Sequence, residues 1–144
     1  MILAWVLTVA GDLAYRQGDC AEARVRQLAS LRLFHTLGDA EGIAAATMGL
    51  GNVAQSMGNY RQSAALFAEC LRLQHPRGDH RCVASALENL GEAVLARGNP
   101  ERASPLFEEC LTMARARGDL LRAASALNGL GLMTFKSTVS RSFL

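Results

Sequence analysis

Side chains that commonly bind metals gather at one point of the sequence. His75, Asp79, His80 and Cys82 lie within the eight residues 75–82. Their spacing matches none of the zinc patterns, in which cysteine and histidine ligands come in closely spaced pairs. We therefore predict no metal at this segment and interpret it as a turn between helices.

Neither nucleophilic nor nucleotide chemistry has a matching pattern of residues. A catalytic cysteine or serine needs a neighbouring base such as histidine. His35 and His75, which are 40 residues apart, instead both lie at predicted helix ends, where a cation interacts favourably with the helix dipole. Gly49-Leu50-Gly51 does not follow a strand, and the chain contains no Gly-x-x-x-x-Gly-Lys-Ser/Thr phosphate loop. We predict no catalytic residue, no cofactor and no enzymatic activity.

The composition narrows the class of protein further. The 144 residues are 50% hydrophobic and 19% charged, with a formal net charge of +2. This balance argues against a disordered tail and against an electrostatic nucleic-acid binder. No apolar run approaches the roughly 20 residues of a membrane helix. The four cysteines are dispersed, as expected for reduced thiols, which indicates a cytoplasmic protein.

A segment of 40 residues recurs along the chain. Residues 40–79 align with residues 80–119 without a gap, and fourteen of the 40 columns are identical. The same frame extends back to Gly11 and forward to Gly131. A fixed period of this length is typical of stacked supersecondary units.

Each unit is predicted to consist of two helices. Residues 41–57 carry apolar side chains at i, i+3, i+4 and i+7, the spacing of a helix. Gly58 ends this first helix, and Asn59 caps a second helix that continues to about residue 74. A glycine closes each second helix at residue 38, 78 or 118. The caps of the next first helices are then Asp39, Asp79 and Asp119.

Two residues inside the predicted helices need a packing explanation. Gly51 recurs at one column although a mid-helix glycine costs about 1 kcal/mol relative to alanine. We expect a close helix crossing there, against the small residues Ala23, Ser63 and Ala103 of the second helices. Pro105 is expected to bend its helix or loosen its first turn.

These elements predict a repeat domain over residues 2–135. Its repeats fall at about 2–39, 40–79 and 80–119, with a half repeat at 120–135. Thr138 stands where the next turn glycine should recur, so residues 136–144 are expected to form an irregular or frayed tail. Both ends of the array are apolar, which indicates an excerpt of a longer array or self-association through uncapped ends.

The turns and packing residues resemble those of the tetratricopeptide repeat. The resemblance rests on Leu50-Gly51, Gly58-Asn59-Tyr60, Ser63, Phe67 and Gly78-Asp79. The repeat of this chain is similar to the 40-residue version found in the C-terminal regions of MalT/LuxR-type and AfsR-type bacterial regulators. The resemblance covers about residues 2–135 and implies an all-α fold, a right-handed α-solenoid of helix-turn-helix repeats.

In this family the first helices line a concave groove that binds the partner. Carried over column by column, the resemblance places these residues in the groove: Asp12, Tyr15, Met48, Asn52, Gln55, Glu88, Asn89, Glu92, Leu95, Asn128 and Leu132. Glu88 and Glu92 lie on one helix face, which is either an ordinary solvated face or an acidic surface for a basic or amphipathic partner segment. The basic residues with which relatives bind C-terminal carboxylates are absent.

The resemblance implies a non-catalytic scaffold that binds a protein or peptide. It further implies the sensor or interaction segment of a larger bacterial signal-responsive transcriptional regulator. The alternative is a stand-alone receptor that binds a small-molecule or peptide signal in the same groove. Neither role requires direct contact with nucleic acid or with a membrane.

Overall fold

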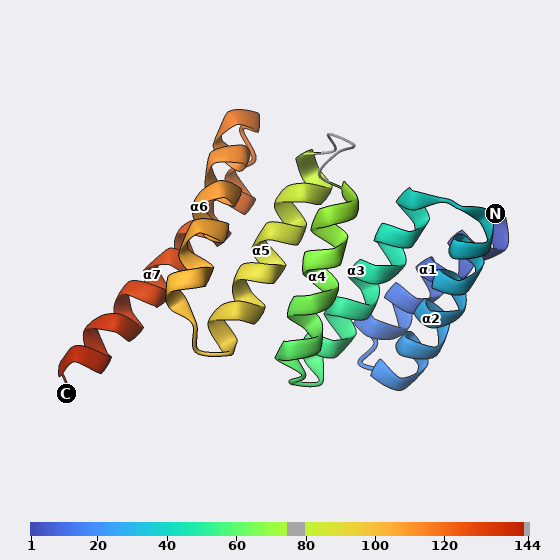
Figure 1. Ribbon diagram of the computed structural model, residues 1–144, viewed down its shortest axis with the longest axis horizontal. Helices are drawn as coiled ribbons and strands as arrows, with labels where there is room; N and C mark the ends of the chain where they lie inside the picture. The colour runs from blue at the N-terminus through green and yellow to red at the C-terminus, as the bar shows by residue number, and fades with distance from the viewer. Residues whose placement is uncertain (75–79, 143–144) are drawn as a thin grey trace. The chain divides into compact units, whose positions relative to one another are not determined.

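The computed structural model describes residues 1–74 and 80–142, with the side chains of residues 1–74 and 81–131. Seven α-helices and no strand occupy this part of the chain (Figure 1). The predicted all-α class is therefore confirmed. The helices are α1 (Ile2–Arg16), α2 (Cys20–Leu37), α3 (Ala40–Ser56), α4 (Tyr60–Gln74), α5 (His80–Ala96), α6 (Pro100–Arg117) and α7 (Leu120–Ser142).

The helices form two compact units, Met1–Asp79 and His80–Leu144. In unit 1, α1 packs on α2, α2 packs on α3, and α3 packs on α4. In unit 2, α5 packs on α6 and α6 packs on α7. Each second helix of a repeat (α2, α6) thus lies against its own first helix and against the first helix that follows.

The turns follow the predicted pattern of glycine and cap. Gly38 and Gly118 close α2 and α6 in the left-handed region, with φ of +65° and +69°. Asp39 Oδ1 accepts a hydrogen bond from the Gly42 backbone N–H, and Asp119 Oδ1 accepts one from Arg122. The predicted caps at residues 39 and 119 are confirmed, while Gly78 and Asp79 lie outside the described residues.

The mid-helix glycines make room for large side chains, not for the small ones that we predicted. A Cβ placed on Gly51 would lie 2.5 Å from Cε1 of Phe67, and one on Gly91 would lie 2.9 Å from Cε1 of Phe107. We expected Ala23, Ser63 and Ala103 nearest to these glycines and Phe67 and Phe107 in the neighbouring interface, but the atoms nearest to Gly51 and Gly91 belong to Phe67 and Phe107. A ring from the second helix lies over the glycine, since only a bare Cα leaves space for it.

One hydrogen bond recurs in all three full repeats. The side chains of Ser30, Cys70 and Cys110 share a column and are buried. Each donates to the carbonyl oxygen of the residue 26 positions earlier, at 2.9, 3.2 and 3.4 Å respectively. The acceptors Ala4, Ala44 and Ala84 also share a column. This bond ties the second helix to the first at the same height in each repeat.

The structure differs from expectation at the end of α7 in unit 2. We expected residues 136–144 to be irregular, but α7 continues to Ser142. No glycine or proline lies between Gly131 and Ser142 to end the helix. Pro105 lies inside α6, which runs unbroken from Pro100 to Arg117.

Candidate functional site

The predicted groove residues of unit 1 lie on α1 and α3, and contacts within the fold engage Asp12 and Tyr15 among them. Asp12 Oδ1 accepts a hydrogen bond of 2.8 Å from Nε2 of Gln27. Partial burial raises the pKa of the Asp12 carboxyl, against the opposing effects of that bond and of Arg16. Tyr15 Oη accepts a hydrogen bond of 3.0 Å from Ser56 Oγ, which links α1 to α3. Met48, Asn52 and Gln55 are half-buried on α3.

In unit 2, the predicted acidic residue Glu88 is engaged within the fold. Its carboxylate accepts hydrogen bonds from Arg122 and Ser125, both on α7, and its side chain is only 14% exposed. The ion pair joins α5 to α7 and balances the charge that we expected to face a partner. Glu88 and Glu92 therefore do not present two uncompensated charges.

The remaining predicted residues of unit 2 differ in exposure. Glu92 and Asn128 are exposed, Asn89 is half-buried, and Leu95 is buried. The side chain of Leu132 lies outside the described residues. Only some of the predicted positions are thus accessible to a partner.

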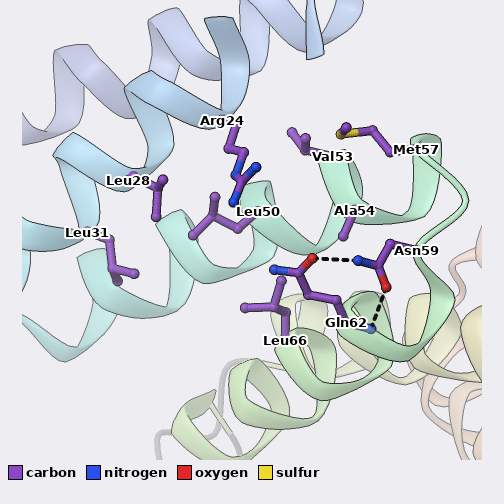
Figure 2. A pocket seen from close by; sticks show the side chains of 10 residues that line it. All are labelled: Arg24, Leu28, Leu31, Leu50, Val53, Ala54, Met57, Asn59, Gln62 and Leu66. Atoms are coloured by element: carbon purple, nitrogen blue, oxygen red, sulfur yellow. Dashed lines mark hydrogen bonds between the residues drawn. The ribbon is translucent and has the colours of Figure 1, made fainter. Parts of the chain in front are cut away.

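The sequence analysis missed a cavity of about 420 Å³ in unit 1. It lies between α2 and α4, over α3, and we call it the α2–α4 trough. Figure 2 shows Arg24 extending from α2 over Leu50 of α3, with Leu66 of α4 on the other side. Its lining residues are Arg24, Leu28, Leu31, Leu50, Val53, Ala54, Met57, Asn59, Gln62 and Leu66.

The polar residues of the trough have different roles. Asn59 and Gln62 are bonded to each other: Asn59 Nδ2 donates to Gln62 Oε1 at 2.9 Å, and the Gln62 N–H donates to Asn59 Oδ1 (Figure 2). Arg24 is exposed and forms no ion pair within the described part of the chain. The trough is therefore an apolar channel with one available cation.

A signal for the trough was present in the repeat itself. Arg24 stands where the later repeats have Ala64 and Ser104, and Leu28 stands where they have Ala68 and Glu108. Positions at which the repeats carry different residues can therefore mark a site that is present in one part of the array and absent from the others.

Metal and thiol chemistry find little support in the described residues. No group of three or more histidine, cysteine, aspartate or glutamate side chains there could hold a metal ion. Of the metal-ligand types at residues 75–82, His75 and Asp79 lie outside the described residues, and so does the His80 side chain. Cys70 and Cys110 are buried, Cys20 and Cys82 are half-buried, and none of the four forms a disulfide within the described residues.

The repeat geometry agrees with comparisons with known proteins. The profile of the tetratricopeptide repeat family matches residues 42–116, just over half of the sequence. The chain belongs to the tetratricopeptide repeat family. No curated protein sequence matches this tetratricopeptide repeat chain.

Many solved structures share its fold, and three of them are compared with it below. The tetratricopeptide repeat domain of Arabidopsis FLU has a TM-score of 0.74 at 18% identity, over 78% of this chain and 95% of that one. BtubC from P. vanneervenii gives 0.78 at 23% identity over 91% of this chain and 54% of its own length, so this chain spans about half of that protein. The N-terminal domain of stress-induced protein-1 from C. elegans gives 0.65 at 16% identity, over 85% and 93%. These likenesses confirm the all-α solenoid.

No helix of the described residues is both long enough and apolar enough to cross a membrane.

Proposed function

We propose that this chain is a non-catalytic scaffold that binds a protein or peptide through the α2–α4 trough. Tetratricopeptide repeat domains generally bind proteins or peptides, which supports the class of function. The observation that carries the proposal is the trough itself, a channel of about 420 Å³ lined mostly by aliphatic side chains beside the unpaired cation of Arg24.

The chemistry of the trough indicates an amphipathic partner segment. Burying one leucine-sized side chain of the partner would contribute about 1.5–3 kcal/mol. A carboxylate of the same segment would pair with the Arg24 guanidinium, which offers donors in a fixed fork. Since Asn59 and Gln62 already bond each other, Arg24 is the group that selects the partner's charge.

The first-helix residues remain a second candidate surface for the same function. In unit 1, Asp12, Tyr15 and Asn52 would suit a basic or amphipathic segment, and in unit 2 Glu92 would do so on its own. The ion pair between Glu88 and Arg122 reduces the negative charge that the first helix of unit 2 offers to a basic partner. We therefore prefer the trough as the binding site.

A small-molecule receptor is the alternative, and the size of the trough is the observation in its favour. Ligand pockets are typically about 300–1,000 Å³ and mostly apolar, with a few polar groups that fix orientation. A ligand of this kind would raise the melting temperature of the isolated chain by mass action, whereas a scaffold would respond only to protein or peptide.

The wider setting belongs to the same proposal. The 40-residue period and the Gly-Asp turns resemble the arrays of MalT/LuxR-type and AfsR-type regulators. We propose a cytoplasmic chain that serves as the sensor or interaction segment of such a regulator, with no direct contact to nucleic acid. The division into repeats at 2–39, 40–79, 80–119 and 120–135 is proposed on the same frame.

The test is selection of peptides from a random display library on the immobilised chain. We expect the selected peptides to combine large aliphatic residues with a carboxylate. Arg24→Glu should abolish their binding, because it replaces the attraction by repulsion. Arg32→Glu is the matched control, since Arg32 is exposed on the same helix but does not line the trough.

Selected peptides that bind Arg24→Glu and the natural chain equally would contradict the trough as the site. Loss of their binding in Asn52→Ala, or in Glu92→Lys, would instead assign them to the first-helix surface of unit 1 or of unit 2, respectively. A library that yields no binder, together with a melting temperature raised by a small apolar acid, would favour the receptor alternative.

A further inference from the structure

The polar and the aliphatic residues that line the two walls of the α2–α4 trough lie at opposite ends. Short turns join α2 to α3 and α3 to α4, so α2 and α4 run in the same direction. Each wall starts with polar residues and continues with leucine. In chain order the residues are Arg24, Leu28 and Leu31 on α2, and Asn59, Gln62 and Leu66 on α4. Figure 2 shows Leu31 and Asn59 on opposite sides of the trough, and we call the end with Asn59 the polar end.

The walls of the trough offer nothing that could pair with the backbone of an extended partner. They are formed by helices, in which the N–H and C=O groups along the helix are bonded to each other, and no strand edge occurs in the described residues. The polar lining side chains are confined to the polar end. Buried backbone groups without partners are costly. A helix satisfies its own backbone groups, so a helix is the form in which a partner can bury aliphatic side chains here.

The length of the trough determines how the partner's side chains are spaced. Leu31 lies seven residues after Arg24 on α2, which corresponds to about 10 Å along the helix axis. Over that distance a partner helix presents residues i, i+4 and i+7 on one face. Two aliphatic side chains at i and i+4 would therefore lie among the leucines, and a carboxylate at i+7 would reach Arg24.

Positive charge prevails at the polar end. Arg24 and Arg61 lie in the first two turns of α2 and α4, whereas the only carboxylate at the start of either described helix that lacks a pairing cation on its own helix is the cap Asp19. The N-terminal ends of α2 and α4 carry positive macrodipole ends, and α3 alone opposes them with its C-terminal end. Other charges near this end occur as opposite pairs on one helix, namely Glu22 with Arg26 on α2 and Asp12 with Arg16 on α1.

Negative charge prevails at the opposite end of the trough. There Asp39 and Glu41 begin α3, and Arg32 of α2 supplies one cation. Glu69 and Arg72 of α4 pair with each other at 2.6 Å. A helix has a positive N-terminal end and a negative C-terminal end. A partner helix is therefore favoured with its C-terminal end at the polar end of the trough.

We infer that the trough binds a helix of another protein that runs antiparallel to α2 and α4, with aliphatic residues at i and i+4 and a carboxylate at i+7. This inference rests on the proposed function and adds the form, the residue order and the direction of the partner segment. The aliphatic side chains lie among Leu28, Leu31 and Leu66, and the carboxylate pairs with Arg24 near the C-terminal end of the partner helix.

The test compares two short helical peptides of identical composition on the full chain. The forward peptide carries Leu-x-x-x-Leu-x-x-Glu at the centre of an alanine and glutamine host about four turns long, with both ends blocked. The retro peptide has the reversed sequence, and circular dichroism checks that both are equally helical. By fluorescence anisotropy the forward peptide should bind about two- to fivefold more tightly, the effect of aligned rather than opposed helix dipoles.

A photoreactive benzophenone on either end of the forward peptide reports the direction. From the C-terminal end it should cross-link to residues 20–24 or 57–61, and from the N-terminal end to residues 31–37. Arg24→Glu should weaken the forward peptide at least about tenfold and should bind the same peptide with lysine in place of its glutamate. Arg32→Glu is the matched control and should retain the forward peptide.

A proline between the two leucines of the forward peptide should abolish binding, because it breaks the helix, and unchanged binding would refute the helical form. Cross-links in the opposite order, or a retro peptide that binds as tightly, would overturn the direction. A forward peptide that does not bind, although selected library peptides depend on Arg24, would overturn the residue order. These outcomes leave the proposed function intact. If neither designed peptide binds and the library peptides are indifferent to Arg24→Glu, the proposed function fails and this inference fails with it.

Discussion

Gln27 occupies the column in which the later repeats carry Phe67 and Phe107. Its side chain is 1% exposed, and it lies over Gly11 and Gly49, as Phe107 lies over Gly91 and Gly129. Nε2 donates to Asp12 and to the carbonyl of Thr8, but Oε1 has no hydrogen-bond partner in the described residues. A buried acceptor without a partner costs about 1–3 kcal/mol.

We therefore expect Gln27→Phe to stabilise the protein by about 1–2 kcal/mol, because it removes that acceptor and adds apolar burial. Urea denaturation of the variant should show a higher midpoint with an unchanged slope. Gln17→Phe, at the exposed end of α1, should leave the midpoint where it is. A lower midpoint in Gln27→Phe would mean that its bond to Asp12 outweighs the unpaired acceptor.

The thiol of Cys110 should make stability depend on alkaline pH. Burial, and next the Glu88 carboxylate, raise its pKa from 9.0 to about 11. Between these two values the folded state holds a proton that the unfolded state has lost, so stability falls as the pH rises through this window. Cys110→Ser should reduce the fall, since Ser30 makes the same bond without titrating.

Denaturation midpoints at pH 8 and pH 10.5 give the comparison for the natural chain and Cys110→Ser. In the same samples at pH 8, a thiol reagent should label the half-buried Cys20 and Cys82 before the buried Cys70 and Cys110. An equal loss of stability in both proteins, or early labelling of Cys110, would contradict the buried thiol as the cause.

At the scale of the helix, Gly51 and Gly131 occupy the same position of the repeat, yet substitution by alanine should change the stability in opposite directions. Gly51→Ala places a methyl group 2.5 Å from the ring of Phe67, whereas a Cβ on Gly131 meets no atom of the described residues within 4 Å. We expect Gly51→Ala to destabilise by about 1–3 kcal/mol through overpacking. Gly131→Ala should stabilise by about 0.5–1 kcal/mol through helix propensity. Thermal melts of the two variants decide this, and a shift of the same sign in both would refute the packing account.

The helices were predictable because each boundary has a local cause. Gly38 with Asp39, and Gly118 with Asp119, end one helix and cap the next within a few residues. The far end of α7 has no such signal, and our expectation of a frayed tail from residue 136 took the missing glycine as an end of the helix. A helix without a stop signal continues instead.

The candidate site was less predictable because it depends on pairs of residues far apart in sequence. The family resemblance placed Glu88 in the groove but could not show that Arg122, 34 residues later, forms an ion pair with it. The choice of Ala23, Ser63 and Ala103 failed for the same reason, because composition alone cannot show that a ring lies over a glycine. The trough is formed by three helices and has no contiguous motif.

At the scale of the whole molecule, the two units should differ in how they respond to a local change. In repeat arrays, stability is approximately a sum of repeat and nearest-neighbour contributions. Gln27→Phe acts within unit 1, so amide hydrogen exchange should slow in α1–α3 more than in α6 and α7. Uniform slowing along the chain would show that the chain opens only as a whole. Gln17→Phe supplies the baseline.

The exposed aliphatic side chains of α1, namely Ile2, Val6, Val9 and Leu13, also bear on how such an array can change in length. A gene duplication that copied residues 1–39 in tandem would place a new Ile2 and Val9 beneath Phe34 and Gln27, where α3 has Gly42 and Gly49. The duplicate could not stack, because both sides of that junction would supply bulk. Residues 40–79 keep the two glycines that a further copy needs. Tandem growth of this protein is therefore expected from its second repeat and not from its first.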